Sequence, residues 1–527
     1  MRQKWIAPVV SLALAATAIS PAAVATEGYD FSTYWTEVEA QREGLASDEV
    51  LLSYNENGAY SGRTSYIEAL DGKTNGGLSL CAEIGEGPCD VNLLLKKKIA
   101  IYAPLVMPLC EDGSDGDCVE SLILIAGDGT RVAAEFIRAV DGPTFKAKSK
   151  FKLPETGTQL LFRAPGVLNA AGTDTYAVEY TQTLEWIGKA TPLYRDLKVA
   201  VTPYVETQDD WAQTPRLVPG ENPMGLGEFT NEPWGIPPGS IWMEDGLLGK
   251  MANFEAGVGA EVSIRANSGF GGWFRGRLSG AEFAASKLSA TQQRIRIAGT
   301  SVEIPRLVGI VNKAQYKKYT DAPMFFYENH KGGGLGGDVS DPEGIFMWLN
   351  AIRAANKDVA SGVHRSWMFA SVTAVLNQGC YKTSGVQGMV ATNAAVYAGG
   401  APKYTGGFLN YKVGGLHYLP DGSEAIGTYD LVMRADIARC LYGFSKAPVS
   451  GTVTVSGDGD TNIATTTVGE KNGWLKLSAN GFTFSTKTIK VKLTQKKQAT
   501  ITCVAIGKKS VKVTAVSPKC PKGYKKR

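Results

Sequence analysis

Short runs of apolar, β-branched and aromatic residues, each bounded by a turn sequence, recur along most of this 527-residue chain. Turn sequences such as Gly127-Asp128-Gly129 and Pro165-Gly166 separate the runs, as expected for short strands joined by tight turns. This spacing predicts a mainly β fold of sandwich-like antiparallel sheets. Before residue 214 the clearest runs are 91–95, 98–106, 120–126, 158–163, 176–186 and 196–205.

Residues 214–250 separate two strand-rich regions. They contain six Pro and seven Gly, which favour irregular backbone because Pro cannot donate to a strand ladder and Gly weakens one. We therefore expect a connector between an N-terminal β domain, residues 26–213, and a second β region, residues 251–495. Residues 496–527 form a separate basic tail. A chain of this length is too long for one hydrophobic core, so a multi-domain fold is expected.

One helix stands out against the strand pattern, near residues 342–357. Pro342 suits the first turn of a helix, and Asp341 or Ser340 can cap it. A second, shorter helix is expected after Asp30, so the fold should contain one or two short helices. The helix near Pro342 presents apolar residues at helical spacing, namely Ile345, Trp348, Leu349 and Ile352.

The N-terminus has the pattern of a cleaved secretory signal, residues 1–25. A charged start containing Arg2 and Lys4 precedes an apolar stretch, and an Ala-x-Ala sequence ends at Ala25. No second apolar run of spanning length follows, so we expect no transmembrane span in the mature chain. The sequence thus predicts a secreted protein, retained at the cell surface.

All eight cysteines follow the signal, and an even number in an oxidising compartment indicates disulfides. Sequential pairing closes the shortest loops, and the equal spacing of the first two pairs suits two loops that are each closed by their own bond. A crossed pairing of Cys89 with Cys110 and of Cys81 with Cys118 is the alternative. Sequential pairing would join Cys81 to Cys89, Cys110 to Cys118, Cys380 to Cys440, and Cys503 to Cys520.

The loop between Cys110 and Cys118 is the one candidate metal site. It contains four carboxylates in seven residues, and calcium prefers such clusters of oxygen ligands. We name Asp112, Asp115 and Asp117 as its candidate ligands. The loop lacks the spacing of an EF-hand, so a solvated acidic loop without a metal is the favoured alternative. No other cofactor is expected.

The chain ends in a separate block of positive charge. Residues 487–527 contain thirteen Lys or Arg and no Asp or Glu. The whole chain carries +4, and the signal holds only Arg2 and Lys4, so residues 26–486 carry −11. A block of this kind acts on partners and solubility, and indicates attraction to an anionic polymer.

Strand-like runs at 500–504 and 511–516 flank Gly507-Lys508-Lys509-Ser510, so the tail is expected to form a basic β-hairpin. We expect it to contact an anionic cell-wall or surface polymer, with no nucleic-acid partner. A solvated basic face with no partner is the alternative. The candidate polymer-binding residues are Lys508, Lys509, Lys512, Lys519, Lys522, Lys525, Lys526 and Arg527.

Several strings in the second half resemble those of uncharacterised exported, surface-type proteins of high-GC Gram-positive bacteria. The resemblance covers roughly residues 250–527. It implies an exported, surface-associated architecture and transfers no catalytic residue. The strings are 272–278 (GWFRGRL), 427–434 (GTYDLVMR), 438–444 (ARCLYGF), 470–477 (EKNGWLKL), and the ending from 500–503 (TITC) through 518–526 (PKCPKGYKK).

No catalytic signature is present, so a non-enzymatic structural or binding protein is favoured. Histidine occurs only at His330, His364 and His417, without metal-spaced partners, and no Gly-x-Ser-x-Gly sequence occurs. The alternative is an extracellular polysaccharide-acting hydrolase. It would need two facing carboxylates and aromatics that stack on sugars, although filling a core is the commoner role of such aromatics. The carboxylates in question are Glu228, Glu232, Glu244 and Asp245, and the aromatics are Trp234, Trp242, Phe254, Phe270 and Trp273.

Overall fold

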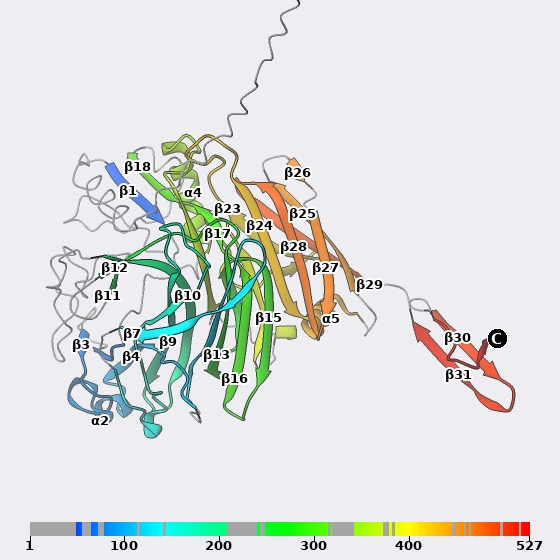
Figure 1. The fold of residues 1–527 in the computed structure, drawn as a ribbon, viewed down its shortest axis with the longest axis horizontal. Coiled ribbons are helices and arrows are strands. Elements are labelled where there is room, and N and C mark those ends of the chain that lie inside the picture. Colours follow the sequence, from blue (N-terminus) through cyan, green and yellow to red (C-terminus); the bar gives the residue numbers. More distant parts are fainter. Residues whose placement is uncertain are drawn as a thin grey trace, which may run out of the picture.

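The computed structural model confirms the predicted fold class: antiparallel sheets dominate, with three helices among the described residues and a small basic C-terminal hairpin (Figure 1). The predicted signal, the helix expected after Asp30 and most of the predicted connector lie outside the described residues. The structure describes residues 49–54, 65–71, 78–112, 116–140, 144–207, 240–242, 248–312, 314, 318, 342–372, 379–381, 385–444, 449–457, 460–462, 465–495, 499–515 and 518–527.

A 16-stranded sheet runs through the body of the molecule. Its pairs are antiparallel except β14–β20, which is parallel. Shorter strands attached beside the main path are β7 (Glu135–Ala139), β8 (Leu160–Arg163), β11 (Ser240–Trp242), β12 (Leu248–Met251) and β17 (Val302–Pro305). The main path consists of β27 (Thr465–Lys471), β28 (Trp474–Thr483), β24 (Ile426–Arg434), β20 (Val386–Thr392), β14 (Gly272–Arg277), β19 (Val363–Val372), β10 (Leu193–Thr207), β9 (Thr175–Ile187), β4 (Ile99–Val106), β2 (Glu68–Asp71) and β3 (Leu78–Leu80).

A five-stranded sheet packs on one face of this large sheet. Trp367 in β19 donates its indole N–H to the carbonyl of Gly299 in the smaller sheet, at 2.9 Å. Apolar side chains at alternate positions of both sheets fill the space between them, as in a β-sandwich. The five strands are β15 (Ser279–Lys287), β16 (Gln292–Thr300), β13 (Gly259–Asn267), β5 (Cys118–Ile125) and β6 (Arg131–Ala133).

A six-stranded sheet packs on the opposite face, at the end of the large sheet that carries β24 and β28. Tyr411 from the smaller sheet lies 5.5 Å from Tyr429 of β24, measured between ring centroids. Leu477 and Ile489 belong to the same buried core. The six strands are β21 (Val396–Tyr397), β22 (Lys403–Thr405), β23 (Phe408–Gly414), β25 (Val449–Gly457), β26 (Asp460–Asn462) and β29 (Lys487–Gln495).

Strands from both sides of the predicted connector share these sheets. β10 pairs with β19 in the large sheet, and β5 pairs with β13 in the five-stranded sheet. The connector region itself contributes β11 and β12, and β12 pairs with the end of β10. The regions before residue 214 and after residue 250 are thus joined by backbone hydrogen bonds as well as by side-chain packing.

The predicted helix near Pro342 is confirmed as α4 (Pro342–Ala355). Trp348, Leu349 and Ile352 are buried against β18 (Leu307–Asn312) and its neighbours, so burial explains the helical spacing. β18 pairs with β1 (Glu49–Tyr54). The side chain of Ile345 lies outside the described residues.

The run at 91–95 was expected to be a strand, and this is wrong. It forms the short helix α2 (Val91–Leu95), because the Asp90 carboxylate caps it by accepting hydrogen bonds from the backbone N–H groups of Asn92 and Leu93, at 2.7 and 3.1 Å. A third helix, α5 (Ala435–Tyr442), follows β24 directly. Single 3-10 turns occur at Gly87–Cys89, Ser149–Phe151 and Gly379–Tyr381.

The C-terminal tail forms its own three-stranded sheet of β31 (Lys508–Ala515), β30 (Ala499–Ala505) and β32 (Lys525–Lys526). Figure 1 shows this hairpin standing apart from the body of the molecule. Its small core contains Ile501 and Cys503, which is fully buried. No helix in the described part of the chain is long and apolar enough to cross a membrane.

Candidate functional site

The structure contains four disulfides, and they join the cysteines in sequential order: Cys81–Cys89, Cys110–Cys118, Cys380–Cys440 and Cys503–Cys520. The first two close loops of the N-terminal half. The third connects the segment before β20 to α5, and the fourth fixes the last residues of the chain against β30. Four disulfides are typical of an extracellular protein.

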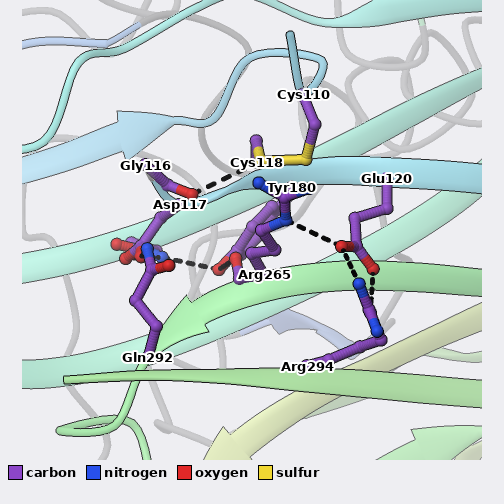
Figure 2. Close-up of a disulfide and its surroundings, with 10 residues drawn as sticks. Cys110, Gly116, Asp117, Cys118, Glu120, Tyr180, Arg265, Gln292 and Arg294 are labelled. Atoms are coloured by element: carbon purple, nitrogen blue, oxygen red, sulfur yellow. Dashed lines mark hydrogen bonds and ion pairs between the residues drawn. A yellow bond between two sulfur atoms is a disulfide. The ribbon is translucent and has the colours of Figure 1, made fainter. Parts of the chain in front are cut away.

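The candidate calcium ligand Asp117 is buried against amide groups from two sheets (Figure 2). Its Oδ2 accepts a hydrogen bond from Gln182 Nε2 of β9 at 2.8 Å, and its Oδ1 accepts one from Gln292 Nε2 of β16 at 3.2 Å. Burial raises the pKa of Asp117, although these hydrogen bonds favour its charged form. The carboxylate therefore links the two layers of the sandwich beside the Cys110–Cys118 bond.

The other two candidate ligands do not complete a metal site in the described structure. Asp112 is exposed, and Asp115 lies outside the described residues. Among the described residues, no three His, Cys, Asp or Glu side chains are grouped as metal ligands. The neighbouring Glu120 is paired with Arg265 at 2.7 Å and with Arg294 at 2.5 Å (Figure 2). Hydrogen bonds from Arg294 are the main cause that lowers the pKa of Glu120.

The aromatic residues considered for sugar stacking lie in the core where the structure describes them. Phe254, Phe270 and Trp273 expose at most 1% of their surface, which confirms their interpretation as core residues. Trp234 and the side chain of Trp242 lie outside the described residues, as do the four carboxylates proposed for a hydrolase. The carboxylates of the hydrolase hypothesis thus belong to the part of the chain that the structure does not describe.

The described histidines have structural surroundings. His364 is buried in β19. His417 places Nδ1 at 2.7 Å from the carbonyl oxygen of Phe484, and its Nε2 lies 3.7 Å from Glu424. His330 lies outside the described residues.

The eight candidate polymer-binding residues are all exposed on the C-terminal hairpin. Lys508, Lys509 and Lys512 lie on β31, and Lys525 and Lys526 form β32, which pairs with β30. The Cys503–Cys520 bond holds Lys519 and Lys522 near the same small sheet. No ion pair joins any of the eight to a carboxylate side chain in the described structure, so the hairpin presents a concentrated positive surface.

A cleft of about 1160 Å³ opens in the body of the molecule, and no sequence motif predicts it. One wall comes from β15, with Lys287 at its end. The lining also includes residues of α5 and of the turn between β27 and β28, which leads into Trp474. Lys287 and Trp474 are far apart in the sequence, so only the pairing of strands brings them to one cleft.

No protein-family model, curated protein or solved structure matches this chain. We therefore infer its function from its own surfaces, chiefly the basic hairpin and the cleft.

Proposed function

We propose that this protein is exported and held at the cell surface by electrostatic binding of its C-terminal hairpin to an anionic cell-wall or surface polymer. The observation that carries the proposal is the exposure of eight cations on one disulfide-tied hairpin with no acidic side chain among residues 487–527. The resemblance of the second half to exported surface-type proteins supports it. The body then works as a disulfide-stabilised structural or binding unit.

A folded hairpin binds a polymer better than a flexible basic tail of equal charge. The disulfide and the paired strands fix the backbone beneath the lysines, so less conformational entropy is lost on binding. Each exposed ion pair contributes only about 0.2–1 kcal/mol, so retention has to come from several contacts at once. Because salt screens exposed charges over about 8 Å at physiological ionic strength, binding should weaken as salt rises.

The test is cosedimentation of the full chain with purified anionic wall polymer. Replacing four hairpin lysines with Gln should weaken binding about fourfold or more, since four contacts of about 0.2–1 kcal/mol each together contribute about 0.8–4 kcal/mol. The four positions are Lys509, Lys512, Lys522 and Lys526. Replacing the same positions with Arg keeps the charge and should preserve binding.

A matched control removes four exposed lysines from the body instead. Lys96, Lys98, Lys403 and Lys471 are exposed and lie outside the hairpin. If the body variant loses as much binding as the hairpin variant, the attraction belongs to the total charge and the hairpin is not the attachment site. If neither variant changes polymer binding, that binding is not electrostatic.

A further inference from the structure

The cleft between β15 and α5 has side chains held in fixed positions along one wall. Arg439 Nη2 donates to both carboxylate oxygens of Glu470, at 2.9 and 2.7 Å. Arg434 makes a two-point contact with Asp436, with Nε at 3.1 Å and Nη2 at 2.6 Å. All four residues line the cleft. Two-point pairs of this kind orient planar groups before any ligand arrives.

The turn Asn472-Gly473 sets the position of an aromatic ring in the same wall. Both residues have positive φ, 53° and 80°, which fits the two-residue hairpin turn favoured by an Asn-Gly sequence. The turn delivers Trp474 to the start of β28. The indole is partly buried against Phe283 of β15, with ring centroids 4.8 Å apart, and it also lines the cleft.

The charges in the cleft favour an anion. The lining contains three basic residues, Lys287, Arg434 and Arg439, and two acidic residues, Asp436 and Glu470. Both carboxylates are already paired with arginines, whereas exposed Lys287 forms no ion pair within the described structure. An exposed ammonium group that lines a cleft and has no carboxylate partner can contact a negatively charged ligand.

We propose that this cleft binds an acidic oligosaccharide, with a uronate carboxylate at Lys287 and the apolar face of a sugar ring on Trp474. A sugar ring presents C–H groups to the electron-rich face of an indole, and its hydroxyls find polar partners in Ser286 and Asn472, which line the cleft. A drug-sized ligand needs roughly 300–1,000 Å³, so about 1160 Å³ suits several linked rings.

The site is built for binding and not for glycoside cleavage. A glycosidase general acid must hold its proton near neutral pH. Burial acts to raise the pKa of Asp436, but the hydrogen bonds and charge of Arg434 outweigh it and hold that pKa below its ordinary value. Asp436 therefore stays ionised, and Glu470 is bound to Arg439. The inference concerns the body alone and does not depend on the hairpin.

The experiment is isothermal titration of the full chain with trigalacturonic acid, and with neutral maltotriose as the comparison. Trigalacturonic acid should bind, and maltotriose should bind at least tenfold more weakly. Lys287→Glu should weaken trigalacturonic acid binding at least tenfold, because it replaces attraction by repulsion. Trp474→Phe, which keeps a ring against Phe283, should also weaken it. Lys96→Glu makes the same charge change at an exposed lysine of α2's C-terminal end, and should leave binding unchanged.

Three outcomes would overturn the proposal: no heat of binding with millimolar trigalacturonic acid, equal binding of maltotriose, or equal affinity in Lys287→Glu and the unaltered chain. The hairpin variant with four Gln separates this site from polymer attachment. If that variant loses trigalacturonic acid binding while Lys287→Glu keeps it, the saccharide binds the hairpin and the cleft assignment is wrong. If the hairpin variant loses only its cosedimentation with the polymer and still binds trigalacturonic acid, the assignment of that ligand to the cleft is unaffected.

Discussion

Leu431 and Val432 are neighbours in β24, yet they belong to different hydrophobic cores. Leu431 packs with the six-stranded sheet, and Val432 packs toward the five-stranded sheet. Successive side chains of a strand point to opposite faces, so β24 lies in a sheet that both sandwiches share. The two cores therefore cannot separate without breaking the strand pairing of the large sheet.

Leu431→Ala should destabilise the whole body and not only its C-terminal half. The side chain is fully buried, so the substitution should lower the free energy of unfolding by about 2–5 kcal/mol. Ile426→Ala in the same strand serves as the control, because Ile426 is 49% exposed. Urea unfolding, followed by fluorescence and by far-UV circular dichroism, measures the free energy of unfolding of both variants. Two separate transitions within the body of the unaltered protein, apart from that of the hairpin, would contradict the shared-sheet interpretation.

Trp348→Ala tests whether α4 has only a packing role. Trp348 exposes 7% of its surface and lies in the core between α4 and β18. Its removal should cost about 3–5 kcal/mol of stability, whereas Asn350→Ala on the exposed face of α4 should cost little. Unchanged thermal stability together with altered ligand binding would instead identify α4 as a recognition surface.

Glu68 makes stability depend on pH near neutrality. The side chain is 6% exposed, and burial raises its pKa from 4.5 to about 7. The folded state thus holds the proton more tightly than the unfolded chain. The resulting stability is fully present below about 4.5 and is lost as the pH rises through about 7. Melting temperatures recorded from pH 4 to 8 should fall over this range, and less so in Glu68→Gln. Equal slopes for both proteins would exclude Glu68 as the cause.

How far the sequence predicts the fold depends on the range of the interactions. α4 was predictable because Pro342 and the spacing of Trp348, Leu349 and Ile352 are local. The run at 91–95 does not by itself predict α2, because five mostly apolar residues fit a strand or a helix equally well, and only the capping by Asp90 favours the helix. The sharing of sheets was not predictable, since the pairing of β10 with β19 joins segments that no local pattern connects.

The same distinction holds for the sites. The positive charge of the hairpin is contiguous in the sequence, so its exposed lysines were identified in advance. The cleft needs Lys287 from one sheet, Arg439 from a helix and Trp474 from another sheet. None of these residues forms a motif by itself. The strings at 438–444 and 470–477 carry a resemblance but no binding motif, and the fold brings residues of both to the lining of the cleft.

The Cys503–Cys520 bond should stabilise the hairpin without affecting the body. Replacing both cysteines with Ser removes a cross-link between residues 17 apart, which is worth about 3 kcal/mol to a sheet with a very small core. The body transition should keep its midpoint, while polymer binding falls. Replacing Cys380 and Cys440 with Ser is the contrasting pair, because that bond lies in the body and its loss should lower the body transition instead. Calorimetry shows whether the hairpin or the body is destabilised in each double variant.

Deleting residues 498–527 should leave the body folded but detach it from anionic polymer. The deletion removes eight cations and no acidic side chain. A mature chain that begins at Thr26 would change its net charge from +2 to −6, so weak attraction turns into repulsion from an anionic wall. The intact protein should elute from wall material as salt rises, and the deleted protein should not be retained at low salt. Retention that persists after the deletion would place the attachment site on the body and leave the hairpin as a solvated appendage.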